Sequence, residues 1–117
     1  MGWDEGINSY IDDYVAPRLE ESYNVELNRV AMDTAEFIRQ VSLDKKADIQ
    51  VGTIDAVWIN GDNFRNAKEA GLLRDGLMGR VPNAELLNET VQQSDAGTPT
   101  EDLELAWGMN NSSCITT

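Results

Sequence analysis

Apolar residues recur every three or four positions over residues 6–23, and the acidic residues there fall mainly between them. Residues at that spacing share one face of a helix, so the pattern predicts an amphipathic helix. Pro17 removes one backbone hydrogen bond and predicts a kink. Asn24 predicts the helix end, since asparagine tolerates the left-handed conformation. The apolar positions are Ile7, Tyr10, Ile11, Tyr14, Val15 and Leu19.

Two later stretches carry the pattern of β-strands. Residues 25–32 at first alternate apolar and polar positions, as a half-buried strand does. Residues 53–59, with the sequence TIDAVWI, are mostly apolar and rich in β-branched and aromatic side chains. That composition is typical of a central parallel strand buried on both faces.

A helical pattern follows each predicted strand. Asp33 and Glu36 have the spacing of a capping box and precede a second apolar stripe at residues 37–41. A third helix is predicted over residues 62–70, with Phe64, Ala67 and Leu72 facing inward and Gly71 as its stop. The order helix, strand, helix, strand, helix predicts an α/β domain in which βα layers form a parallel sheet with right-handed crossovers.

The pattern weakens after Leu73. Residues 74–83 contain Gly76, Gly79 and Pro82 and predict a loop, and residues 84–91 predict a short helix. Residues 92–100 have the composition of a turn-rich linker. A strand is predicted over residues 103–109, and a loose polar tail over residues 110–117. The length of 117 residues suits one domain with a modest core, here taken as residues 1–117.

The charge balance excludes some partners. There are 9 basic and 21 acidic residues, for a net charge of −12. Nucleic acids and anionic membrane surfaces both require a basic face, so neither is an expected partner. An acidic surface suits a soluble protein, a cationic ligand or a saline environment, and simple solvation of the charges is its ordinary explanation.

The absence of several residue types argues against catalysis. The chain has no histidine, and Cys114 is its single cysteine, so histidine-dependent catalysis, histidine metal sites and an intrachain disulfide are excluded. The acidic pairs at residues 12–13 and 20–21 lie on a predicted exposed helix face, where solvation is the usual explanation. No glycine pattern for nucleotide phosphates occurs. We therefore expect a non-enzymatic protein without cofactor or metal.

The residues 60–63, Asn-Gly-Asp-Asn, join the best predicted strand to a helix and admit two interpretations. Asn60 or Asp62 is suited to cap the helix, and Gly61 to adopt an unusual backbone angle. A parallel sheet, however, binds ligands beyond the carboxyl ends of its strands, and one cap needs fewer polar groups than this junction supplies. Two other places qualify by position, residues 2–5 and residues 32–34. Trp3 beside Asp4 suits a cationic ligand, whereas Asp33 is more simply a capping residue.

The segments WDEGINSYIDDYV, DTAEFIRQV, GTIDAVWINGDNFRNAKEAGLL and GTPTEDLELAWGM occur in this order over residues 2–110. Together they resemble the solute-binding proteins of bacterial ABC importers, in particular a subgroup related to thiamine, iron and polyamine binders. The segment IDAVWINGDNF is the most specific part of the resemblance.

The resemblance implies a type II periplasmic binding protein, a two-lobed protein that captures a small solute between its lobes and delivers it to an ABC permease. The chain would be part of lobe 1. Trp3 and Asp4 would lie in the loop after the first strand, Asn60, Gly61, Asp62 and Asn63 in the loop after the third strand, and Trp107 near the cleft. The implied location is periplasmic or extracellular. No signal-peptide pattern precedes the domain, so a chain expressed as given is expected in the cytoplasm.

Several departures from the family pattern favour a truncated lobe 1 fragment. The chain starts at Met1-Gly2-Trp3, after the position of the family's apolar first strand, and a second lobe does not follow residues 107–109. A sheet without that strand has an unpaired position. The alternative function is therefore a small orphan α/β domain that self-associates through exposed sheet positions and forms a homodimer without a transport role.

Overall fold

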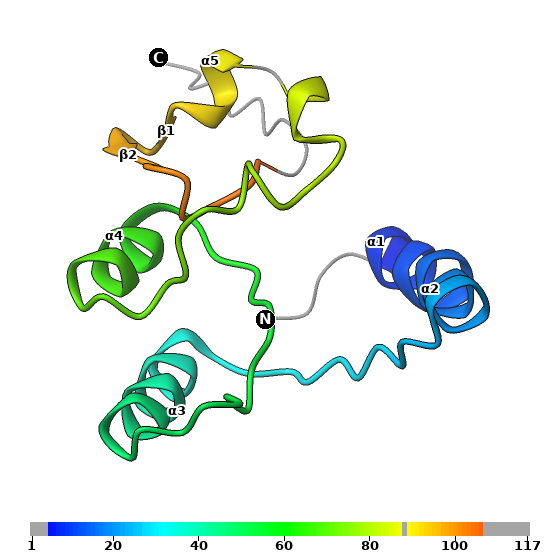
Figure 1. Ribbon diagram of the computed structural model, residues 1–117, viewed down its shortest axis with the longest axis horizontal. Helices are drawn as coiled ribbons and strands as arrows, with labels where there is room; N and C mark the ends of the chain where they lie inside the picture. Colours follow the sequence, from blue (N-terminus) through cyan, green and yellow to red (C-terminus); the bar gives the residue numbers. More distant parts are fainter. Residues whose placement is uncertain (1–4, 88, 107–117) are drawn as a thin grey trace, which may run out of the picture. The chain divides into compact units, whose positions relative to one another are not determined.

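The computed structural model describes residues 5–87 and 89–106 and divides the chain into two compact units (Figure 1). The N-terminal unit ends at Phe37, and the C-terminal unit begins at Ile38. This boundary lies inside helix α3 (Thr34–Lys46). The sequence-based assignment of residues 1–117 to a single lobe stays a prediction, and the predicted polar tail at residues 110–117 lies outside the described residues.

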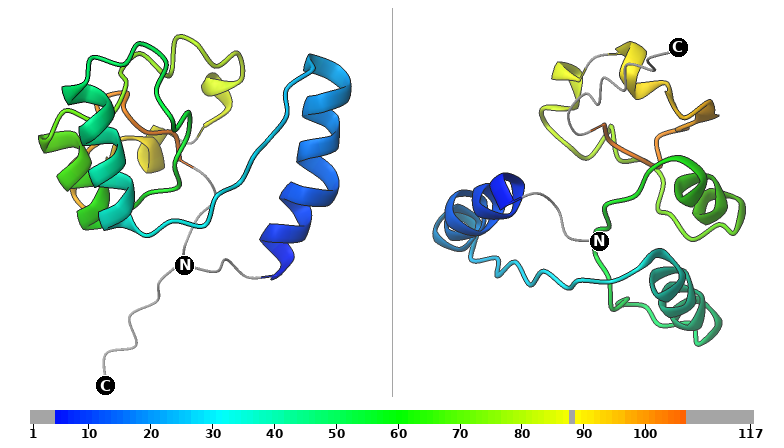
Figure 2. Two further views of the ribbon diagram at one scale, coloured as in Figure 1. Left: turned by 90° about the horizontal axis from the view of Figure 1, so that it is seen from below. Right: turned by 180° about the vertical axis from the view of Figure 1, so that it is seen from behind.

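The N-terminal unit begins with three consecutive helical elements, α1 (Glu5–Ser9), the π-helix η1 (Tyr10–Val15) and α2 (Ala16–Tyr23), which run on as one helix (Figure 2). They confirm the predicted helix, and Asn24 ends it with φ 54°, as expected. Pro17 lies in the first turn of α2 and cannot donate to a carbonyl. Just before it, the Ala16 N–H donates to the carbonyl of Ile11, five residues back. The backbone therefore adjusts to the proline through a π turn.

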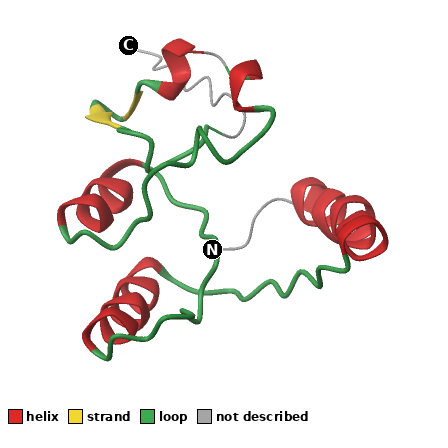
Figure 3. Cartoon of the chain, in the orientation of Figure 1, coloured by secondary structure: helices red, strands yellow, loops and turns green. Residues whose placement is uncertain are grey.

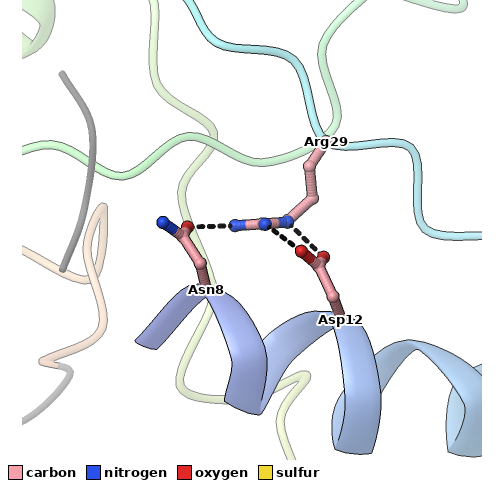
Figure 4. Close-up of polar contacts among 3 residues, drawn as sticks. All are labelled: Asn8, Asp12 and Arg29. Carbon is pink, nitrogen blue, oxygen red and sulfur yellow. Dashed lines mark hydrogen bonds and ion pairs between the residues drawn. The ribbon is translucent and has the colours of Figure 1, made fainter. Parts of the chain in front are cut away.

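Residues 24–33 follow as an extended segment that Arg29 fastens to the helix (Figure 4). The Arg29 guanidinium donates to both Asp12 carboxylate oxygens, at 2.8 Å and 2.5 Å. Its third contact is a 2.9 Å bond to the side-chain oxygen of Asn8. Asp12, expected to be merely solvated, thus has a specific partner. The ion pair is solvent-exposed, so it contributes little to stability.

The C-terminal unit holds the rest of α3 and five short elements: α4 (Gly61–Glu69), the 3-10 helix η2 (Ala84–Leu86), α5 (Glu89–Gln92), β1 (Ser94–Asp95) and β2 (Thr98–Pro99) (Figure 1). The predicted helix at residues 62–70 is confirmed, with Phe64 and Ala67 completely buried. Gly71 follows it with φ 62°. The predicted cap of α3 is confirmed too, since the Asp33 carboxylate accepts the Glu36 N–H at 2.8 Å.

The predicted parallel-sheet α/β fold is wrong. Helices make up 47% of the described residues and strands 4%, and the described sheet has two antiparallel strands (Figure 3). Residues 25–32 and 53–59 belong to no strand. Val30, Val57 and Trp58 are 67%, 38% and 48% exposed. The sequence pattern of these segments fits a pleated surface, but a strand also requires a neighbouring strand for its backbone hydrogen bonds. The described residues supply none for either segment.

The strands that do form lie in a stretch predicted as linker. β1 pairs with β2 in the register Ser94 to Pro99 and Asp95 to Thr98. The two residues between them, Ala96 and Gly97, have φ of 45° and 83°. Two positive φ angles in succession suit a tight hairpin turn that matches the twist of its strands. Of the strand predicted over residues 103–109, residues 103–106 are not strand, and the remainder lies outside the described residues.

Carboxylates bind backbone N–H groups in the C-terminal unit. The Asp44 carboxylate accepts the Thr53 N–H at 2.9 Å and the Thr53 hydroxyl at 2.7 Å, and it also accepts the Gln40 amide. These hydrogen bonds, the Thr53 N–H first, lower the pKa of Asp44 below its usual value. Asp102 likewise accepts the Met78 N–H at 2.5 Å. Backbone N–H groups that are partly withdrawn from water need acceptors, and here side chains supply what a sheet would otherwise provide.

Candidate functional site

The junction at residues 60–63 forms the N-terminus of α4, which packs inward through Phe64 and Ala67. Asn60 is the N-cap residue with an extended backbone, φ −159° and ψ 165°. Its carbonyl accepts the N–H groups of Asn63 and Phe64, at 3.2 Å and 3.3 Å. Its side chain makes no capping hydrogen bond. The interpretation in which the Asn60 side chain caps the helix is therefore wrong, although Asn60 does occupy the N-cap position.

The N–H group of Gly61 is instead bound by Asp95 of β1. The Asp95 carboxylate oxygen accepts this N–H at 2.5 Å, across 34 positions of sequence. A carboxylate at a helix N-terminus is stabilised by the helix dipole as well as by the hydrogen bond. Gly61 itself has φ 54°, a conformation that glycine adopts without strain. The hairpin thus provides the anionic cap of α4.

The side chains of Asp62 and Asn63 lie beside this cap. Asp62 forms an exposed ion pair with Arg65, one helical turn along α4, with 2.9 Å between oxygen and nitrogen. Asn63 is partly exposed. The structure therefore leaves two amides and one carboxylate at the start of α4 that the backbone cap does not use. Amides and a carboxylate bind polar neutral or cationic groups through hydrogen bonds and charge.

Glu104 was not singled out in the sequence, yet it lies in the electrostatic environment of this cap. Partial burial, followed by the charge of Asp95, raises the pKa of Glu104 to about 7. Gln92, a buried residue, holds the backbone around it. Its amide nitrogen donates to the Glu104 carbonyl, and its amide oxygen accepts the Ala106 N–H at 2.8 Å. Glu104 therefore changes charge close to neutral pH.

Sequence reasoning missed Asp95 because it lies in a turn-rich stretch without a helical or strand pattern. It missed Glu104 because nothing in the strand predicted at residues 103–109 marks this carboxylate as a site residue. A weak signal was present in SDAGTP at residues 94–99, where Ala-Gly separates short polar arms as in a hairpin. Nothing in the sequence, however, indicates that Asp95 reaches the start of α4. Two further contacts fasten the hairpin there: Lys68 donates to the Pro99 carbonyl at 2.6 Å and pairs with Glu101 at 2.9 Å.

The other predicted site residues are not placed. Trp3, Asp4 and Trp107 lie outside the described residues, so the structure does not test whether they join Asn60, Gly61, Asp62 and Asn63. Within the described ranges, no group of three or more histidine, cysteine, aspartate or glutamate side chains is arranged to hold a metal ion. Nor is any helix in those ranges long and apolar enough to cross a membrane.

Comparison with known proteins gives one informative similarity. The chain is 32% identical over 110 residues to "Protein YnjB" of Escherichia coli strain K12. The aligned region covers 92% of this chain but 28% of that protein, so the chain spans little more than a quarter of the length of its relative. No family model matches the chain, and no solved structure matches it.

Proposed function

We propose that the chain is part of a non-enzymatic solute-binding component of an ABC-type importer and contributes one wall of a small-molecule cleft at the N-terminus of α4. One observation carries the proposal: the backbone cap of α4 is made by Asp95, whereas Asn60, which the sequence marks as the cap, makes no side-chain cap. The polar side chains of this junction are therefore in excess of what the helix requires, as in a ligand-binding loop.

The chemistry of the junction favours a polar neutral or cationic solute. Asn60 and Asn63 supply amide groups, and Asp62 supplies a carboxylate. Arg65 pairs with Asp62 and Lys68 pairs with Glu101, so these two ion pairs are neutral, and the Asp95 carboxylate adds a negative charge at the start of α4. Trp3, Asp4 and Trp107 complete the set of proposed contacts by resemblance to the binding-protein family. No cofactor or metal is proposed.

Three further features rest on the same resemblance: an ABC permease as the protein partner, a location outside the cytoplasm, and a second lobe that closes the cleft. The relative in Escherichia coli is much longer than the aligned region, which is compatible with such additional parts. The name of that protein states no ligand, so the solute must be identified by experiment.

The test is calorimetric titration of the chain with thiamine, spermidine and ferric citrate. If one binds, the double variant Asn60→Ala/Asn63→Ala is expected to weaken the binding about tenfold, because two side-chain hydrogen bonds contribute roughly 0.5–1.5 kcal/mol each. The melting temperature should barely change, since Asn60 provides no side-chain cap. Asn66→Ala is the matched control, an exposed asparagine further along α4.

Two results would contradict the proposal. One is a chain that binds none of the three compounds even at millimolar concentration. The other is binding that the double variant and the Asn66→Ala control affect equally, because the ligand would then not contact the start of α4.

A second candidate function, self-association, is favoured by the segment at residues 49–59, which belongs to no helix or strand. It contains one charged residue, Asp55, in a chain of net charge −12. Val51 is 82% exposed, and no described strand pairs with this segment. A largely apolar, nearly uncharged segment outside the described sheet is a template for pairing with another chain.

Light scattering over a range of concentrations tests self-association. We expect a dimer that Val57→Lys dissociates, because a charge on an extended edge opposes strand pairing. Leu86→Lys, at an exposed apolar residue of η2, is the control and should leave the dimer intact. A monomer at all concentrations would exclude this function.

A further inference from the structure

A groove of about 410 Å³ lies on the C-terminal unit, at the C-terminal end of α3. It shares no lining residue with the junction at residues 60–63 and is therefore distinct from the proposed solute site. Its volume is in the range that proteins use for small molecules. Four aliphatic side chains supply its apolar lining: Val41, Ile49, Ile54 and Leu72.

Specific hydrogen bonds hold the walls of this groove in place. The Asp44 carboxylate binds both the N–H and the hydroxyl of Thr53, and the Asp44 carbonyl accepts the Ile49 N–H at 3.1 Å. The Lys45 ammonium donates to the Gly71 carbonyl at 2.9 Å, which joins α3 to the loop after α4. A site whose walls are already ordered loses less entropy when it binds a ligand.

The same bonds decide which charges remain for a ligand. Of the four charged residues that line the groove, Asp44 and Lys45 are used by Thr53 and Gly71. Among the described residues, Arg74 has no hydrogen-bond or ion-pair partner. Asp48 receives one long contact, 3.3 Å, from the Gln50 amide. One guanidinium and one carboxylate are thus left beside four aliphatic side chains.

We propose that this groove binds a small zwitterion with an aliphatic side chain, that is, an aliphatic amino acid. The carboxylate of the ligand pairs with the Arg74 guanidinium, its ammonium group pairs with Asp48, and its side chain packs on the aliphatic lining. The lining carries two acidic and two basic residues, so a ligand with one charge of each sign keeps the net charge of the groove at zero. An anion would meet Asp48 and a cation would meet Arg74.

NMR titration of the full chain with L-leucine tests the site, because glycine amides mark its walls. Gly52 and Gly71 line the groove, so their ¹H–¹⁵N signals should shift when leucine binds. The signals of Gly61 and Gly79, which do not line it, should stay unchanged. Gly61 also reports on the junction before α4, so failure of this site is distinguishable from failure of the proposed solute site. A leucine-induced shift of Gly61 without Gly52 and Gly71 would overturn the assignment.

Two analogues of leucine separate the charges. 4-Methylpentanoate lacks the ammonium group, and 3-methylbutylamine lacks the carboxylate. Each should bind about three- to fivefold more weakly than leucine, the usual effect of losing one partly exposed ion pair. If either analogue binds as tightly as leucine, the groove does not recognise a zwitterion and the proposal is wrong.

Matched variants locate the charges. Arg74→Gln and Asp48→Asn should each weaken leucine binding about three- to fivefold. Arg80→Gln and Asp75→Asn replace exposed residues that do not line the groove and should leave leucine binding unchanged. Asn tolerates the positive φ of 53° at position 48, so Asp48→Asn preserves the local backbone. Equal losses in variants and controls would overturn the proposal.

Discussion

The two units of the chain differ in how their residues are stabilised. In the N-terminal unit no side chain of residues 5–36 is buried, although these residues contain a helix of three consecutive elements; Phe37, the last residue of the unit, is 5% exposed within α3. In the C-terminal unit, by contrast, Phe64 and Ala67 are 0% exposed, and Ala84 is 5% exposed. The helix of the N-terminal unit is explained mainly by its local sequence pattern and helix propensity. The C-terminal unit is stabilised in addition by packing between segments that are distant in sequence.

Acidic residues serve different purposes in the two units. Asp12 forms an exposed ion pair with Arg29, whereas Asp44, Asp95 and Asp102 each accept a backbone N–H from another segment of the C-terminal unit. A charge-assisted bond to a backbone N–H both satisfies that group and fixes a loop. Some of the acidic residues that the sequence analysis assigned to a solvated surface therefore have a structural role.

The largest expected effect is that of Phe64→Ala. Removing this completely buried ring should cost about 3–5 kcal/mol, because it leaves a cavity in the packed face of α4. Urea titration followed by residue-specific NMR is the measurement. Signals of Ala67 and Ala84 should be lost at lower urea than in the unsubstituted chain, because both lie in the same unit.

Leu86→Ala provides the control, since that side chain is 78% exposed and should change stability by less than about 0.5 kcal/mol. Equal effects of the two substitutions would show that the C-terminal unit lacks the packed core described here.

Glu104→Gln is expected to have a smaller effect, and a stabilising one at alkaline pH. Burial raises the pKa of Glu104 from 4.5 to about 7, so the folded chain binds this proton more tightly than the unfolded chain. The favourable contribution is complete below pH 4.5 and is lost as pH rises through about 7. At pH 8 the glutamine should stabilise the chain by about 1–2 kcal/mol, allowing for solvent screening.

The measurement is the free energy of unfolding at pH 4, 6 and 8 for both chains. The two curves should separate between pH 4 and 8, and Glu85→Gln, at an exposed position of η2, should leave the curve unshifted. A Glu104→Gln chain whose stability depends on pH as strongly as before would contradict the raised pKa.

The smallest effect is expected for Asp12→Asn in the N-terminal unit. Loss of the exposed ion pair with Arg29 should cost at most about 1 kcal/mol and less in high salt. Backbone ¹⁵N relaxation at residues 25–32 should show increased motion, because Arg29 fastens this segment to the helix. Asp13→Asn is the matched control on the adjacent residue, and an equal response to it would exclude a specific role for Asp12.

Helices were predictable where one short stretch of sequence carries the whole signal. The helix at residues 6–23, the Asp33 cap and the burial of Phe64 and Ala67 each depend on neighbours three or four positions away, and the structure confirms all three, although no side chain of the first helix is buried. The predictions of strands at residues 25–32 and 53–59 were wrong, because an apolar or alternating pattern of side chains does not specify whether a partner strand is present.

The candidate site also divides into a part that the local sequence predicted and a part that depends on the tertiary structure. The sequence alone determined that residues 60–63 carry more polar groups than a helix start requires, because residue types and a nearby helix pattern suffice for that inference. Only the tertiary structure decided which group caps α4, since Asp95 reaches Gly61 from 34 positions away. Hydrogen bonds within one helical turn join residues that are close in sequence, so the local sequence determines them. Hydrogen bonds between distant segments depend on how packing brings those segments together.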